Sequence, residues 1–302
     1  MPPLDHPYLR MGELDRLRHL QFSPRRPVEG LYAGRHRSRQ RGHSVEFNDY
    51  RPYLPGDEIA DIDWKVFGRT DRLYVKLFEH QSDMTVHLLV DGSASMGYQS
   101  ADAATAISKY DQACRLAASI AFLTIAQQDR ASFAIARHGL RHFHPPGRTD
   151  QHLHGILDAM TLTRLGGEAD LPEAITRLAA RVQRRGVIIL LSDLLDDREA
   201  TLSALSQFTG RGSEVIVFHV LHEHELKLPD LDSAVFVDSE NAQRLTVNVS
   251  DVRSAYDTRL QEFLDAWSAG FQARGMDYNL VSTATPGSAV LQKYLFARAA
   301  SG

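Results

Sequence analysis

The chain has few of the features that mark secreted or membrane-spanning proteins. Cysteine occurs once among 302 residues, as Cys114, so no disulfide can form within the chain and a reducing compartment is expected. No apolar run approaches the roughly 20 residues that a membrane-spanning helix needs. The first 20 residues carry charges throughout and lack the apolar core of a signal peptide. We therefore expect a soluble, cytoplasmic protein without a transmembrane segment.

A large excess of one charge is also missing. The 34 basic and 38 acidic residues give a formal net charge of −4, which gives no indication of a nucleic-acid partner. The stretch 24–44 is the exception, because six arginines stand there against the single acid Glu29. They are Arg25, Arg26, Arg35, Arg37, Arg39 and Arg41. A phosphate or nucleic-acid patch is one interpretation. A solvated or partner-facing loop is favoured, because the series of aromatic residues that single-strand binders use is missing.

The apolar residues are arranged in a pattern that indicates the fold class. Short apolar runs, typical of buried strands, alternate with longer segments of helical periodicity. Strands are expected at 85–90, 132–136, 140–144, 187–191, 214–221 and 277–282, helices at 103–127, 152–160, 171–184, 199–208, 250–274 and 288–299, and a hairpin near 234–249. This alternation predicts an α/β fold with a doubly wound, mostly parallel sheet over residues 84–302.

Residues 1–83 have a different pattern, and we expect them to form a smaller N-terminal segment packed on the sheet domain. Apolar residues at helical spacing predict a short amphipathic helix over 11–21. Alternation of apolar and polar residues predicts a half-buried strand over 71–79, leading into the first strand of the sheet.

The stretch Met84–Gly97 holds the clearest candidate site. Its aliphatic run 85–90 is followed at alternate positions by Asp91, Ser93 and Ser95. In open α/β sheets, ligands bind at the carboxyl ends of the strands. One carboxylate and two hydroxyls converging there would suit Mg²⁺, which prefers oxygen ligands and keeps several waters.

Asp91-Gly-Ser93-Ala-Ser95 resembles the D-x-S-x-S motif of von Willebrand factor A domains, the core of their metal-ion-dependent adhesion site. The resemblance implies ligands from two further loops. Asp193, just after the strand 187–191, stands where the third loop supplies an acid, although a turn or helix N-cap role is the alternative. The second loop supplies a threonine in that family, but here it reads Leu165-Gly-Gly-Glu-Ala-Asp-Leu171. Glu168 could replace the threonine as a ligand, or Asp170 could act through water.

A second resemblance is more specific and covers the chain from about residue 30 to its end. Its residues are Gly34-Arg-His-Arg-Ser38, Gly42, Glu46-Phe47, Arg51-Pro-Tyr53, Pro55-Gly-Asp57 and Ile62-Asp-Trp64-Lys65, followed by the Asp91 motif. The chain resembles the bacterial family called "domain of unknown function 58", which joins such a segment to a von Willebrand factor A-like domain. It departs from that family at 59–61, where Ile-Ala-Asp stands instead of a sequence with arginine.

The family resemblance implies a protein-binding adaptor that works with a MoxR-type AAA+ ATPase to assemble or activate client proteins. Recruitment would use the metal-bearing residues Asp91, Ser93 and Ser95. We select Asp57, Asp63, Trp64 and Lys65 as a candidate surface for the ATPase or for domain packing. Packing of Trp64 in a core is the alternative interpretation.

Enzymatic activity is not expected. The chain has no phosphate-binding G-x-x-x-x-G-K-[ST] loop, and its serines do not form a G-x-S-x-G nucleophile elbow. No histidine or second acid is evidently placed beside Asp91 as a general base. The histidines at 138–154 lack a known zinc spacing and are interpreted as surface or strand-face residues. Two alternatives remain open, a Mg²⁺-dependent phosphohydrolase using Asp91 and an interaction domain whose metal site is vestigial.

Overall fold

The computed structural model describes residues 6–9, 22, 46–53, 62–79, 84–100, 107–237 and 244–300. The chain forms two compact units, and each is described by itself. The larger unit comprises Met1–Arg26 and Met84–Gly302, and the smaller unit is Pro27–Asp83.

The larger unit is built on a six-stranded sheet with the order β10-β7-β6-β3-β4-β5. Its strands are β3 (Thr85–Asp91), β4 (Arg130–Ala136), β5 (Leu140–Gly147), β6 (Val187–Ser192), β7 (Glu214–Leu221) and β10 (Asp277–Ser282). All neighbours are parallel except β4 and β5, which pair antiparallel at one edge. The α/β fold with a doubly wound, mostly parallel sheet is therefore confirmed, including the short edge strand expected near 140–144.

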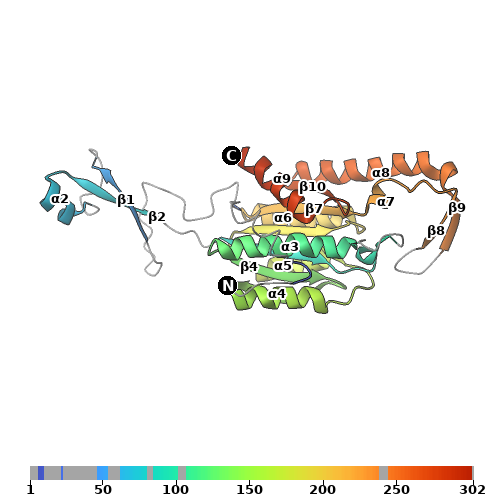
Figure 1. Ribbon diagram of the computed structural model, residues 1–302, viewed down its shortest axis with the longest axis horizontal. Helices are drawn as coiled ribbons and strands as arrows, with labels where there is room; N and C mark the ends of the chain where they lie inside the picture. Colours follow the sequence, from blue (N-terminus) through green and yellow to red (C-terminus); the bar gives the residue numbers. More distant parts are fainter. Residues whose placement is uncertain are drawn as a thin grey trace. The chain divides into compact units, whose positions relative to one another are not determined.

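Helices cover both faces of this sheet (Figure 1). They are α3 (Lys109–Ala126), α4 (Asp150–Leu162), α5 (Leu171–Arg181), α6 (Arg198–Gly210), α8 (Val249–Gln272) and α9 (Gly287–Ala300). One core joins side chains of α3, α4 and α9 to the sheet, and a second core joins α5, α6 and α8 to its other face. Every residue of β3 is buried, because a central strand between two helical layers has no face in water.

The helix α3 begins where a capping box fixes its first turn. The Ser108 hydroxyl accepts a hydrogen bond from the Asp111 amide, and the Asp111 carboxylate accepts one from the Ser108 amide. The sequence predicts a helix from residue 103, but the observed helix starts at Lys109, and residues 101–106 lie outside the described part. Fifteen of its 18 residues are buried, so α3 is the central helix of its layer.

The N-terminal residues differ from the prediction of a single segment 1–83, because the first 26 belong to the larger unit. Leu9 and Phe22 are buried in the core beside α3 and α9. The Tyr8 hydroxyl donates to Asp111 at 3.2 Å, and the Arg298 guanidinium lies 5.2 Å from the centre of the Phe22 ring. Leu9 and Phe22 therefore belong to the core of the larger unit and not to a separate N-terminal segment. The helix predicted over 11–21 lies outside the described residues.

The smaller unit pairs β1 (Glu46–Pro52) antiparallel with β2 (Tyr74–Glu79), and α2 (Trp64–Thr70) lies between them in the chain. The strand predicted over 71–79 is therefore present as β2. The first strand and the helix were not predicted. Packing of this unit on the sheet domain stays a prediction.

Two further elements follow β7 in the larger unit. The short helix α7 (Glu223–Leu226) was not predicted, whereas the hairpin expected near 234–249 is present as β8 (Ser233–Val237) and β9 (Arg244–Asn248). The hairpin lies at the N-terminal end of α8 (Figure 1).

His87 in β3 makes the stability of the larger unit depend on pH. Its Nδ1 lies 2.6 Å from the Ser132 hydroxyl, and burial lowers the pKa of the imidazole from 6.5 to about 4. Between pH 6.5 and 4, His87 is therefore protonated in the unfolded chain but neutral in the folded chain. The stability from neutral His87 is complete above pH 6.5 and is lost as the pH falls toward 4, by up to about 3 kcal/mol.

Urea unfolding of the wild type and of His87→Gln at several pH values between 4 and 7 tests this. The variant is expected to lose a clear part of the slope of unfolding free energy against pH. An unchanged slope in His87→Gln would show that another group causes it.

Candidate functional site

The candidate site lies at the carboxyl ends of two neighbouring central strands. Asp91 is the last residue of β3, and Ser192 is the last residue of β6. The two strands are parallel, with Val90 opposite Leu191, so the residues that follow them meet at one edge of the sheet. Ser95 opens the short 3₁₀ turn η2 (Ser95–Gly97), which directs the chain away from the sheet.

The three residues of the D-x-S-x-S motif lie in one buried cluster. One Asp91 oxygen accepts from the Ser93 amide at 2.8 Å, and the other accepts from the Ser192 hydroxyl at 2.6 Å. The hydroxyl oxygens of Ser93 and Ser95 are 3.1 Å apart. All of these side chains are buried. The structure thus brings the carboxylate and both hydroxyls together, and adds Ser192, which the sequence did not single out.

Burial strongly disfavours the charged form of Asp91. Burial and, second to it, the neighbouring Asp193 carboxylate raise the pKa of the carboxyl, and hydrogen bonds from Ser192 and Ser93 partly offset both effects, so that the pKa lies at about 7. In the described part of the chain, no cationic side chain pairs with Asp91. The site therefore holds a buried acid that a bound cation would stabilise.

Asp193 has a cation of its own, which the sequence interpretation missed. The Lys109 ammonium lies 2.7 Å from an Asp193 carboxylate oxygen and 2.6 Å from a Glu225 carboxylate oxygen. Burial opposes the charge on Lys109, but Asp193 and Glu225 outweigh it and raise the pKa of the ammonium above its usual value. The signal was the position of Lys109, four residues before Ala113 on the apolar face of the predicted helix.

The surroundings of Asp193 and Glu225 hold this ion pair in place. The Asp193 carbonyl accepts from His219 Nε2 at 2.9 Å, and the second oxygen of Glu225 accepts from the His222 amide at 2.8 Å. Asp193 thus pairs with an internal ammonium, and its other carboxylate oxygen accepts from the Leu195 amide at 3.4 Å, which agrees with the turn alternative. The N-cap of α6 is Asp197, so the helix-cap alternative does not describe Asp193.

The second loop reaches the motif through its backbone. Gly166 donates its amide to the Gly92 carbonyl at 3.3 Å, and the Gly167 carbonyl accepts from the Ala94 amide at 2.9 Å. The Glu168 side chain is exposed, and no hydrogen bond or ion pair joins it to the motif in the described residues. A ligand role for Glu168 stays a prediction. Asp170 instead caps α5, accepting from the Glu173 amide.

Three of the five predicted metal ligands lie together as a set of oxygen donors that fits a divalent cation. Asp91, Ser93 and Ser95 supply the hard oxygens that Mg²⁺ prefers. Asp193 could join them only in competition with Lys109, which already pairs with one of its carboxylate oxygens. Among the described residues, no group of three or more His, Cys, Asp or Glu side chains is arranged to hold a metal. A cation at this site would therefore be bound through the carboxylate of Asp91 and the hydroxyls of Ser93 and Ser95.

The predicted partner-facing residues of the smaller unit divide into structural and exposed ones. Asp57 lies outside the described residues. Asp63 is the N-cap of α2, and one of its oxygens accepts from the Lys65 and Val66 amides. Trp64 has 58% of its surface exposed, so packing in a core does not describe it.

The fold and the site define a class of protein: an open α/β sheet whose loops gather acidic and hydroxyl groups at the carboxyl edge. The family model described as "Protein of unknown function DUF58" matches residues 49–263, and the chain belongs to this family. The uncharacterized protein Rv1480 of Mycobacterium tuberculosis is 30% identical over 251 residues, covering 80% of this chain and 77% of the relative. The uncharacterized protein Mb1516 of Mycobacterium bovis shows the same identity and coverage.

Solved structures match most of this chain at low sequence identity. BatB from Bacteroides thetaiotaomicron is 14% identical, with 72% of this chain and all of that chain covered and a TM-score of 0.44. The SpRpn10 VWA domain is 12% identical, with 70% and 95% covered and a TM-score of 0.42. The fold assignment rests on the strand order and helix placement described above. None of the described helices is both long and apolar enough to cross a membrane.

Lys109 provides a test of the site's internal charge balance. Replacing it in Lys109→Met leaves Asp193 buried without its cation, and we expect a loss of about 3–5 kcal/mol in unfolding free energy. Lys293→Met, an exposed change on α9, is the matched control and should be nearly neutral. Urea unfolding at pH 7.5 measures both variants. Equal stabilities of the two would contradict the ion pair.

Proposed function

We propose that the chain is a non-enzymatic, metal-dependent protein-binding adaptor. A divalent cation, Mg²⁺ or a similar ion, is held by Asp91, Ser93 and Ser95 and takes a carboxylate from a partner protein at an open coordination position. The observation that carries this proposal is the buried Asp91 carboxylate, which lies beside two hydroxyls with no cationic side chain paired to it in the described residues.

Neutral hydroxyl ligands explain why such a site would bind a partner. A cation with one carboxylate and two serine ligands keeps a net positive charge, which favours a further anionic oxygen. The described surroundings of Asp91 contain hydroxyl, amide and carboxylate groups, without an imidazole hydrogen-bonded to it that would serve as a base. This arrangement favours binding over turnover.

The family membership and the exposed Trp64 support the second part of the proposal. The adaptor works in the cytoplasm with a MoxR-type AAA+ ATPase in the assembly or activation of client proteins. The smaller unit contacts the ATPase through Trp64 and Lys65, which are exposed next to each other at the start of α2. Exposed tryptophans contribute strongly to protein interfaces because they bury a large apolar area.

The metal site is tested by isothermal titration of MgCl₂ and MnCl₂ into the wild type and Asp91→Ala. About one equivalent is expected to bind the wild type, as for a single oxygen-ligand site, and none the variant. Asp265→Ala, which removes an exposed acid from α8, should bind as the wild type does. Failure of the wild type to bind either metal would contradict metal dependence. Phosphate release from a phosphomonoester panel that requires Asp91 would contradict the non-enzymatic role.

The ATPase surface is tested with the purified chain and the MoxR-type ATPase of the same organism. Trp64→Ala should weaken their complex at least about tenfold in biolayer interferometry, since central aromatic contacts contribute 2 kcal/mol or more. Leu162→Ala, which removes an exposed apolar side chain from the larger unit, is the control. Equal binding by both variants would remove Trp64 from the interface, and no binding by the wild type would reject this partner.

A further inference from the structure

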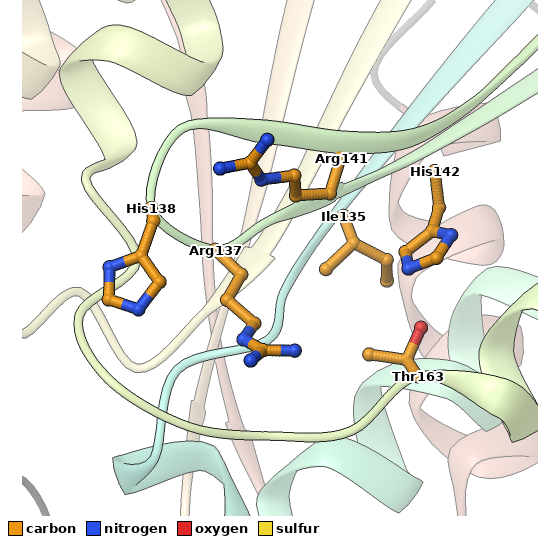
Figure 2. A pocket seen from close by; sticks show the side chains of 6 residues that line it. All are labelled: Ile135, Arg137, His138, Arg141, His142 and Thr163. Atoms are coloured by element: carbon orange, nitrogen blue, oxygen red, sulfur yellow. The ribbon is translucent and has the colours of Figure 1, made fainter.

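A polar cavity lies at the turn between β4 and β5. It has a volume of about 190 Å³ and is lined by Ile135, Arg137, His138, Arg141, His142 and Thr163. We call it the basic pocket. Figure 2 shows that the basic side chains come from one hairpin and that Thr163 closes the cavity from the segment after α4. Its size suits a small anion and not a drug-sized ligand, which needs about 300–1,000 Å³.

The backbone of the hairpin is distorted in a way that gathers these side chains. Between Phe133 and Ile135 on β4, the pairing with β5 advances from His144 to Arg141, so β5 contains one extra residue, a β-bulge. His142 has φ of 46°, the left-handed conformation that side chains rarely adopt. In a regular strand, consecutive residues face opposite sides. The bulge instead lets Arg141 and His142 line the same cavity.

The turn at 137–139, between β4 and β5, likewise directs neighbouring side chains to the same cavity. His138 has φ of 46° and Gly139 has φ of 83°, and Arg137 and His138 both line the pocket although they are neighbours in the chain. Left-handed conformations of non-glycine residues cost free energy and concentrate at functional sites. Two of them border this one cavity.

The pocket carries uncompensated positive charge. In the part of the chain that the structure describes, no carboxylate forms an ion pair with Arg137 or Arg141. Arg137 donates Nε to the Gly166 carbonyl at 3.2 Å and Nη1 to the Arg164 carbonyl at 2.6 Å, which fixes its guanidinium at the cavity and leaves Nη2 for a ligand. The Arg141 side chain is exposed and forms no hydrogen bond with the side chains or backbone of the described residues.

We propose that the basic pocket binds a phosphoryl group, either inorganic phosphate or the phosphate ester of a small molecule. Two guanidinium groups supply two positive charges, and the Arg141 fork alone has five N–H donors. A carboxylate offers two oxygens and one charge, whereas a phosphoryl group offers three or more oxygens and nearly two charges. The number of donors and the charge at the pocket therefore favour phosphate over a carboxylate.

The test is titration of inorganic phosphate into the full-length protein at constant ionic strength, followed by the backbone amide signals of the β4–β5 hairpin in NMR. Saturable shifts of residues 136–142 are expected. Arg141→Gln should weaken binding at least about tenfold, because it removes charged hydrogen bonds without disturbing a packed residue. Arg259→Gln, an exposed change on α8 that alters the net charge equally, should bind as the wild type does.

Further ligands make the result decisive. Tighter binding of glycerol 3-phosphate than of phosphate would assign the ester as the source, and the reverse order would assign the free ion. Glutarate binding as tightly as phosphate would overturn the proposal, as would shifts that do not saturate or that persist in Arg141→Gln. All phosphate titrations are made in EDTA without added divalent cations, so this inference is tested separately from the proposed metal site.

Discussion

The Lys109 ammonium, buried between two carboxylates, is the interaction on which the arrangement of the site depends. Removing an ammonium group from water costs free energy unless carboxylates pair with it. Here the two carboxylates come from different parts of the chain. Asp193 follows a central strand and Glu225 lies on α7, so one side chain joins the first turn of α3 to both. The capping box at Ser108 places Lys109 at the start of that turn.

This ion pair also sets the electrostatic character of the neighbouring motif. With Lys109 engaged by Asp193 and Glu225, the Asp91 carboxylate has hydrogen-bond donors but no cation among the described residues. The two acids at this sheet edge therefore differ: Asp193 pairs with the internal cation Lys109, whereas Asp91 has no cationic partner among the described residues. The site is therefore asymmetric in charge before any ligand arrives.

The sheet and the motif could be predicted from the sequence because their signals are local. The run 85–90 is continuously apolar, as a strand buried on both faces must be, and the motif follows it directly. The ion pair could not be predicted in the same way, since Lys109 and Glu225 are 116 positions apart and meet only through the strand order. The position of Lys109 on an apolar helix face is a signal of a buried charge, but it does not identify the partners.

Other misses have similar physical causes. Burial of Leu9 and Phe22 in the larger unit depends on tertiary contacts that N-terminal periodicity does not reveal. The bulge at His142 changes which side chains share a face, and a pattern with period two assumes a regular register. Short elements such as α7 and α2 contain too few residues for helical periodicity to be recognised.

The close approach of Gly167 to His138 has a consequence for how this family can vary. A Cβ atom at position 167 would lie 2.3 Å from the His138 ring, and Gly167 has φ of 64°. Any side chain at 167 would have to displace the imidazole and strain the backbone. The His138 side chain is exposed and can rotate away, so the left-handed backbone is the larger obstacle: a relative that carries a side-chain ligand at 167 needs a differently shaped turn there. Gain of such a ligand would then depend on the backbone conformation of this loop and not on the substitution at 167 alone.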